Sequence, residues 1–208
     1  MQIQKDEVRA KIIEVAGQEF LKHGFKGASM RTIAKKAHTT LGNIYNYFGN
    51  KEEIFDAVVG DIPKLLEELI HNHETREKEE EISLTELKEK MQAFMPKAFG
   101  FDVMLSTSFV ILMECSEGTR YEGYQKAFYE MACEHMTSHV DEIFPDKQHP
   151  LLAATLTQSF ITSTLFIARH KKNLQEGIEE LVNFIAVMIS GLVAMMPQQK
   201  EGNSHDQG

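Results

Sequence analysis

The apolar residues of this chain follow a helical rhythm wherever their pattern is strong, and this restricts the fold more than any other feature. They recur three and four positions apart between Val8 and Phe20, and the same spacing returns in the long segments after residue 100. No segment alternates polar and apolar residues clearly enough to indicate a β-strand. The pattern therefore predicts an all-α protein of about nine helices.

Residues that prefer helix ends divide this pattern into short and long helices. Gly24 is expected to end the first helix, and Ser29 and Thr40 are expected to cap two short helices. Asn50 and Glu53 have the spacing of a capping box at the start of a further helix at residue 51. Other expected helices span residues 30–37, 41–48, 83–94, 102–114, 121–142, 151–171 and 175–195.

Charge is distributed unevenly along the chain. Up to residue 52 there are nine Lys and Arg against five Asp and Glu, a balance of +4. The remainder holds the other 13 of the 22 basic residues and 26 of the 31 acidic ones, a balance of −13. A basic first quarter on an acidic body suggests that only the first quarter contacts a polyanion. The alternative is a chance imbalance on solvated helix faces.

Several classes of protein find no support in the sequence. The apolar run 184–196 is too short and too interrupted to span a bilayer, and the first residues lack the apolar region of a signal peptide. Two unpatterned cysteines suit a reducing compartment, so we expect a cytoplasmic protein without a membrane partner. Neither a glycine-rich phosphate loop nor a recognisable catalytic motif is present, so no catalytic residue and no cofactor are expected.

A metal site was considered on one helix. His135 and His139 lie four residues apart, as metal ligands on a helix often do, and Cys133 is close in sequence. The flanking acidic residues are typical of a solvated face, and a glutamate in the arrangement of zinc proteases is missing. The sequence therefore predicts no metal.

The segment 39–54 combines three aromatic rings with several amides. It holds the second of two short helices that are joined by a tight break and preceded by a longer amphipathic helix, and this order predicts a helix-turn-helix. Its short third helix would be supported by Ile33, Ile44 and Phe48. Amide side chains offer donors and acceptors to base edges, and phenols reach phosphates. This composition favours a helix that enters a DNA groove.

The same residues carry a family resemblance. Arg31-Thr-Ile-Ala-Lys-Lys-Ala37, Gly42-Asn-Ile-Tyr-Asn-Tyr-Phe48 and Asn50-Lys-Glu-Glu-Ile54 together resemble the DNA-binding domain of TetR-type transcriptional regulators. The resemblance covers about the first 55 residues and implies a homodimer whose body binds a small effector. His38 and Thr39 replace the usual Gly-Val of the turn, and Asn43 stands where Thr is more usual.

Carried over residue by residue, the resemblance implies a set of DNA contacts. Arg31 would contact a base or a phosphate, Asn43 would face base edges, Tyr45 and Tyr47 would contact the backbone, and Lys51 a phosphate. For Tyr45 the alternative is a core ring. The full set expected at the DNA is Arg31, Thr39, Thr40, Leu41, Asn43, Tyr45, Asn46, Tyr47 and Lys51.

The middle of the chain is rich in Phe and Met, which suits a pocket for a moderately sized apolar ligand. At helical spacing, most of these residues are expected to be core in any case. Glu114 would anchor the ligand, or else lie at an exposed helix end. The candidate ligand residues are Phe94, Met104, Phe109, Met113, Glu114, Tyr124, Phe128 and Met131.

The last two expected helices are apolar on more than one face, which is typical of helices that either lie at the centre of their own fold or are shared with a partner subunit. Operator half-sites one helical turn apart, together with the family resemblance, favour the partner. We therefore expect a symmetric four-helix dimer interface. Its candidate residues are Leu152, Leu156, Phe160, Leu181, Ile185, Met188 and Leu192.

These observations predict a helix-turn-helix DNA-binding domain at residues 1–52, an effector-binding and dimerisation domain at 53–196, and a disordered tail at 197–208. The expected function is a ligand-responsive transcriptional regulator that binds a palindromic operator in double-stranded DNA. A repressor released by a small apolar effector is favoured, with an activator as the alternative. The rival from another class is a helical small-molecule-binding protein or enzyme with an incidental N-terminal three-helix unit.

Overall fold

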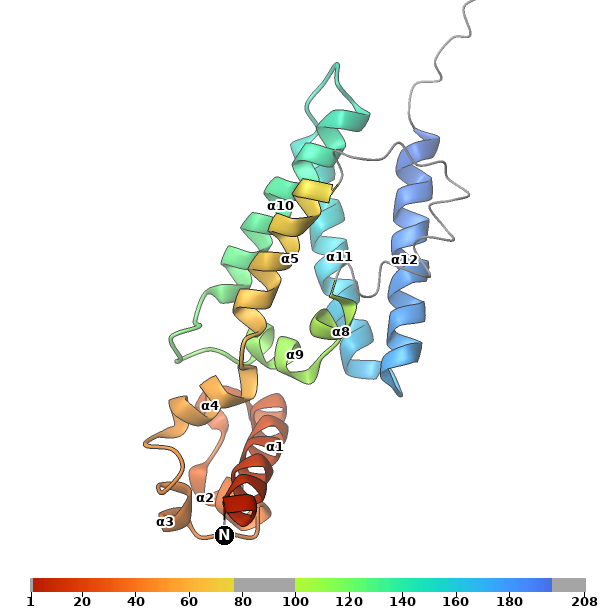
Figure 1. Ribbon diagram of the computed structural model, residues 1–208. Helices are drawn as coiled ribbons and strands as arrows, with labels where there is room; N and C mark the ends of the chain where they lie inside the picture. The colour runs from red at the N-terminus through yellow and green to blue at the C-terminus, as the bar shows by residue number, and fades with distance from the viewer. Residues whose placement is uncertain (1, 77–99, 196–208) are drawn as a thin grey trace, which may run out of the picture.

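The computed structural model describes residues 2–76 and 100–195, and every element in these two ranges is an α-helix. The all-α prediction is thus confirmed. A small head holds the first four helices, and an elongated body stands on it (Figure 1). The head consists of α1 (Gln2–Gly27), α2 (Met30–Lys36), α3 (Leu41–Ile44) and α4 (Lys51–Val59). The body consists of α5 (Ile62–Arg76), α8 (Phe101–Met104), α9 (Thr107–Glu114), α10 (Tyr124–Ile143), α11 (Pro150–His170) and α12 (Leu174–Ala194). The helix expected over 83–94 and the tail expected over 197–208 lie outside the described residues.

The head is held together by aromatic rings at the end of α1. The chain kinks at Gly24, whose φ of 68° ends the regular helix where the sequence predicted. Phe20 and Phe55 are fully buried with ring centroids 5.2 Å apart, and Phe25 lies 5.5 Å from Phe55 in an edge-on contact. Such pairs stabilise the packing beyond the area they bury. The cluster ties α1 to α4.

Two predicted caps are present. Thr40 Oγ1 accepts a hydrogen bond from the backbone N–H of Asn43 at 3.1 Å. Asn50 Oδ1 accepts from the N–H of Glu53 at 2.9 Å, and the Glu53 carboxylate accepts in return from the N–H of Gly49 at 2.7 Å. Ser29 occupies the cap position of α2, but its hydroxyl makes no capping bond.

The predicted domain boundary at residue 52 falls inside α4. This helix buries Ile54 and Phe55 completely against the rest of the head, so it packs as part of the head. The chain leaves the head only at Gly60, whose φ of 55° breaks the helix before α5 begins.

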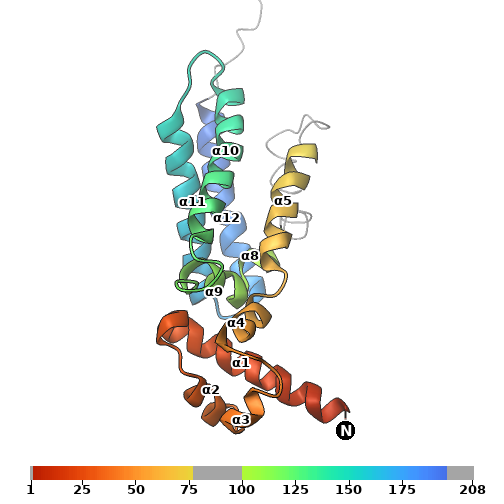
Figure 2. The ribbon, with the colours of Figure 1, turned by 90° about the vertical axis from the view of Figure 1, so that its left-hand side faces the viewer.

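The body is built from three long helices, α10, α11 and α12, with α5 at their side (Figures 1 and 2). The short helices α8 and α9 lie at the end of the body that meets the head. The sequence predicted one helix over 102–114. The structure divides it because Ser106 Oγ accepts from the N–H of Phe109 at 3.0 Å and starts a new helix there.

Helix α11 is, among the described helices, the one with the length and apolar composition to cross a bilayer. In the structure it packs against α10 and α12, and its buried side includes Thr157 and Thr164.

Candidate nucleic-acid interface

The predicted DNA-contacting side chains lie on or beside two short helices that the head core holds in place. Ile33 of α2, Ile44 of α3 and Phe48 behind it are at most 3% exposed, so the third helix is anchored as predicted. Tyr45 is 52% exposed, which argues against the alternative of a core ring. The other predicted contacts divide into exposed residues (Arg31, Thr40 and Asn46) and half-buried ones (Thr39, Leu41, Asn43, Tyr47 and Lys51).

The turn between α2 and α3 is a Schellman motif with histidine in the glycine position. His38 N–H donates to Lys35 O at 3.2 Å, and Thr39 N–H donates to Ala34 O at 3.0 Å. His38 itself has a φ of 53°, and it is the one non-glycine residue with positive φ in the described ranges. A side chain in this left-handed conformation costs about 1–2 kcal/mol, and glycine avoids the cost.

Replacing His38 with glycine is therefore expected to stabilise the protein. The free energy of unfolding should rise by about 0.5–1 kcal/mol. Glycine removes the backbone strain at position 38, but its greater freedom in the unfolded chain offsets part of that gain. His38→Val should lower stability, since a β-branched residue fits this conformation poorly. Urea denaturation of the three proteins measures both changes. Equal denaturation midpoints for the wild type, His38→Gly and His38→Val would show that residue 38 carries no backbone strain.

Lys51 does not have the environment predicted for a phosphate contact. Its Nζ donates to the carbonyl oxygens of Phe25 and Ala28, at 2.7 and 3.0 Å, and lies 4.4 Å from the centroid of the Phe25 ring. Burial lowers the pKa of this ammonium group. In this structure Lys51 thus holds the connection between α1 and α2 through two of its three N–H donors, and its contact with a phosphate stays a prediction.

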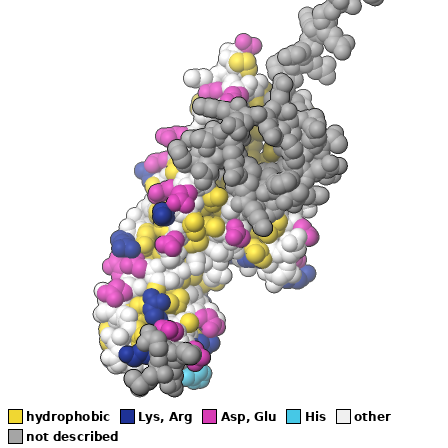
Figure 3. Space-filling model, viewed as in Figure 1, with side chains coloured by type: hydrophobic (Ala, Val, Ile, Leu, Met, Phe, Trp, Pro, Cys, Tyr) yellow, Lys and Arg dark blue, Asp and Glu magenta, His cyan; other side chains and the backbone are white. Residues whose placement is uncertain are grey.

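The head also contains an ion pair that the sequence did not predict. Glu19 lies in the apolar stripe of α1 and is only 2% exposed, and its carboxylate accepts from Lys36 Nζ of α2 at 2.5 Å. A single carboxylate inside an apolar stripe was the available signal, since such a group needs a partner. Figure 3 shows acidic and basic side chains side by side on the visible face of both the head and the body.

Most of the predicted ligand residues that the structure describes are core residues. Met104, Phe109, Met113 and Phe128 are at most 8% exposed, and the rings of Phe109 and Phe128 meet edge-on at 6.0 Å. Met131 is half-buried, and Phe94 lies outside the described residues. The set therefore forms part of the body core, whether or not a ligand enters it.

Tyr124 lies beside this core and faces α5. Its hydroxyl donates to the carbonyl oxygen of Pro63 at 3.2 Å, and its ring stacks on Phe128 at 6.5 Å. Burial, and to a smaller degree the charge of Glu67, raises the pKa of Tyr124 to about 12. The hydroxyl is therefore neutral at physiological pH and acts as a hydrogen-bond donor.

Glu114 has a protein partner. Its carboxylate accepts from Arg169 of α11, with Nε at 2.7 Å and a second contact from the same guanidinium. The residue is exposed at the end of α9, as the alternative interpretation had it. A ligand anchored there would have to compete with this ion pair.

The predicted dimer residues divide into two groups. Leu181 is fully buried within its own chain and belongs to the same core as Phe109, so its assignment to a subunit interface was wrong. Leu152, Leu156, Phe160, Ile185, Met188 and Leu192 are half-buried. Three apolar side chains outside the predicted set are more exposed than any of its members: Leu151 is 82% exposed, Phe166 62% and Val187 73%.

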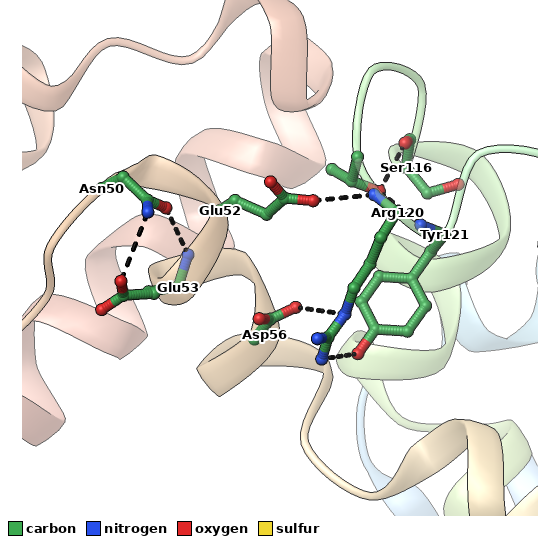
Figure 4. A network of polar contacts seen from close by, with 8 residues as sticks. Asn50, Glu52, Glu53, Asp56, Ser116, Arg120 and Tyr121 are labelled. Carbon is green, nitrogen blue, oxygen red and sulfur yellow. Dashed lines mark hydrogen bonds and ion pairs between the residues drawn. The ribbon is translucent and has the colours of Figure 1, made fainter.

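The loop between α9 and α10, residues 115–123, holds the head to the body (Figure 4). Glu52 Oε1 of α4 accepts from the backbone N–H of Arg120 at 2.8 Å. The Arg120 guanidinium lies 3.1 Å from Asp56 Oδ1 as an ion pair without hydrogen-bond geometry, and it donates to the Tyr121 hydroxyl at 2.9 Å. The Tyr121 ring in turn lies 6.0 Å from Phe55 in the head core.

A second group of contacts joins the end of α1 to the same loop. Phe25 N–H donates to Cys115 O at 3.0 Å, and Lys26 Nζ pairs with Glu117 at 2.7 Å. The Glu117 contact raises the pKa of Lys26, and Lys26 lowers the pKa of Glu117. The sequence identified this loop only as a break between helices, because contacts between distant segments leave no local pattern.

The two candidate metal ligands on α10, His135 and His139, lie side by side. The Nε2 atoms of His135 and His139 lie 3.0 Å apart, and burial, followed by the charge of His135, lowers the pKa of His139. Among the residues that the structure describes, no group of three or more potential ligands is arranged around a common point.

The head sequence matches a known family. Residues 12–58 match the family model "Bacterial regulatory proteins, tetR family". The chain is 43% identical over 47 residues to the uncharacterized HTH-type transcriptional regulator YhgD of Bacillus subtilis, a match that covers 23% of this chain and 25% of the relative. It is 41% identical over 54 residues to the HTH-type transcriptional repressor SCO4008 of Streptomyces coelicolor, a match that covers 26% of this chain and 28% of the relative. The chain thus aligns with about a quarter of the length of these relatives.

Solved structures resemble most of the chain in fold. AibR in complex with isovaleryl coenzyme A and operator DNA matches with a TM-score of 0.52 and 16% identity, over 87% of this chain and 97% of AibR. Apo AibR matches with a TM-score of 0.50 and 19% sequence identity, again over 87% of this chain and 97% of AibR. At this identity the likeness establishes the arrangement of helices and nothing finer.

Proposed function

We propose that this chain, whose residues 12–58 match the family model of tetR bacterial regulatory proteins, is a dimeric repressor released from its operator by a small apolar effector. The observation that carries the proposal is a rigid helix-turn-helix with exposed amide, hydroxyl and phenol groups, joined by specific contacts to a helical body. Amides suit base edges, and hydroxyls and phenols suit phosphates.

Dimerisation is supported by the exposed apolar groups of α11 and α12. Leu151, Phe166 and Val187 together place large apolar side chains in solvent on the two helices. A face of this kind, when buried against its copy, would set two heads at a fixed spacing. Two helix-turn-helix units at a fixed spacing read two half-sites of a palindrome.

Response to an effector is supported by the position of α9. Within one turn of this helix, Phe109 points into the body core while Ser108 Oγ donates to the carbonyl oxygen of Val58 in α4 at 2.6 Å. A ligand that displaces Phe109 would therefore disturb a direct contact with the head. It would shift the population toward forms with wrongly placed heads, and DNA would weaken ligand binding by the same factor.

The proposal is tested by selecting bound duplexes from a random pool and measuring the affinity of the enriched sequence at several salt concentrations. A regulator should enrich a palindrome and show a steep decrease in affinity with salt. The rival, a helical binding protein or enzyme, would enrich no sequence. Apolar compounds that raise the melting temperature without DNA can then be tested for release of the enriched duplex.

Ser108→Ala is expected to weaken the response to such a compound more than it weakens DNA binding. The variant loses one hydrogen bond between α9 and α4, which contributes about 0.5–1.5 kcal/mol to stability. The quantity to measure is the ratio of DNA affinities with and without the compound. Thr107→Ala, at the exposed neighbour, is the matched control and should leave this ratio unchanged. If Ser108→Ala leaves the ratio unchanged too, coupling does not pass through this contact.

A further inference from the structure

Three side chains on the DNA-facing segment form a continuous hydrogen-bonded chain. Asn43 Nδ2 donates to Thr39 Oγ1 at 2.8 Å, and Asn46 Nδ2 donates to Asn43 Oδ1 at 3.2 Å. The Asn43 backbone N–H is also occupied, because it donates to Thr40 Oγ1 in the helix cap. The middle amide of this chain is therefore fixed at both ends.

The backbone explains why the two amides meet. Helix α3 is regular only from Leu41 to Ile44, and the chain then tightens. Asn46 N–H donates to Asn43 O at 3.1 Å, and Tyr47 N–H donates to Ile44 O at 2.9 Å. These bonds between residues three apart bring residue 46 over residue 43. The sequence alone predicted a longer regular helix, 41–48, in which residues three apart are neighbours but do not lie directly in line.

The side-chain amides of Asn43 and Asn46 differ in which donors and acceptors remain unused within the protein. An amide carries two N–H donors and an oxygen that can accept. Asn43 is half-buried and uses both its oxygen and one N–H inside the protein. Asn46 is exposed and uses one N–H, and within the described ranges no group donates to its Oδ1. Asn46 thus presents an acceptor and a donor side by side.

We propose that Asn46 reads an adenine in the major groove, and that Asn43, held by Thr39, is a positioning residue that fixes the plane of the Asn46 amide. The proposal rests on the proposed function as a DNA-binding regulator. Adenine is the base that presents a donor, N6–H, beside an acceptor, N7, and an asparagine amide pairs with both at once. Guanine presents two acceptors there, so the amide oxygen would face another oxygen. The earlier assignment of the base contact to Asn43 is thereby transferred to Asn46.

The test is selection from a random duplex pool with the wild type and two matched aspartate variants. Asn46→Asp removes the donor, so the adenine at one position of each half-site should be lost and cytosine, whose N4–H donates, favoured instead. The preference should change by about 5- to 150-fold, the equivalent of 1–3 kcal/mol for a bidentate pair. Asn43→Asp can still accept from Asn46 and can take a hydrogen bond from the Thr39 hydroxyl. Asn43→Asp should therefore weaken binding to all sequences and leave the preference for adenine unchanged.

A second pair of variants tests the positioning role. Thr39→Val removes the hydroxyl at similar size and should reduce the preference for adenine several-fold, whereas Thr39→Ser should retain it. Melting temperatures of all variants check that the head remains folded.

Each outcome assigns a role. If the preference for adenine disappears with Asn43→Asp and persists with Asn46→Asp, Asn43 reads the base and the proposal is overturned. If Thr39→Val binds with unchanged preference, the positioning role is refuted. If the wild type enriches no sequence at all, it is the proposed function that fails, and the assignment of Asn46 fails with it.

Discussion

Leu181→Glu is expected to prevent the body from folding. The side chain of Leu181 has no exposed surface and lies in the continuous core of the chain. Its removal alone costs about 2–5 kcal/mol, and burial of an unpaired carboxylate adds several more. Since a domain is stable by about 5–15 kcal/mol in total, the sum approaches or exceeds what the fold can lose. We expect insoluble protein, or soluble protein without a cooperative thermal transition.

Val187→Glu on the same helix is the matched control. Val187 is 73% exposed, so a glutamate there should leave the single chain folded. If this face of α12 is shared with a second copy, two carboxylates then enter the interface and sedimentation should show monomers. A folded monomer from Leu181→Glu would instead mean that Leu181 meets the partner subunit. An unchanged dimer from Val187→Glu would place the interface elsewhere.

Lys51→Met should destabilise the head by about 2–3 kcal/mol. Methionine keeps most of the apolar stem but loses two hydrogen bonds from a charged donor, each of which contributes about 1.5–3 kcal/mol, and the partial burial of the charge offsets part of that. The carbonyl oxygens of Phe25 and Ala28 would both lose the hydrogen bond that they accept from Lys51 Nζ. Chemical denaturation measures the loss. Lys35→Met is the control, because Lys35 is exposed and its replacement should change stability by less than about 0.5 kcal/mol.

DNA binding by the same variant tests the original phosphate assignment. If Lys51 is structural, the slope of log affinity against log salt should be unchanged for the folded fraction. A slope reduced by about one, with stability intact, would restore the phosphate contact and remove the structural role.

The head was largely predictable because its signals are local. The caps at Thr40 and Asn50 and the break at Gly24 depend on residues within one helical turn of one another, and each is present in the structure. The family resemblance rested on the same short segments, and the match over residues 12–58 confirms it.

The body was less predictable because its decisive contacts join distant segments. Leu181 lies in an apolar stripe that continues to Leu192, and a stripe alone does not tell which residues face their own chain. That depends on where the other body helices pack. The pairing of Glu114 with Arg169, 55 residues apart, is of the same kind, and no local pattern announces it.

The junction between head and body has a consequence for protein engineering. Three of its contacts use a main-chain atom on at least one side: Phe25 N–H donates to Cys115 O, Arg120 N–H donates to Glu52, and Ser108 Oγ donates to Val58 O. Backbone groups are the same for every sequence that adopts the same conformation. A foreign head with this backbone would therefore need only a glutamate at position 52 to make all three of these bonds with the native body. Under the proposed function, DNA-binding specificity and effector response can then be recombined as separate modules, with the sequence of the loop 115–123 left unchanged.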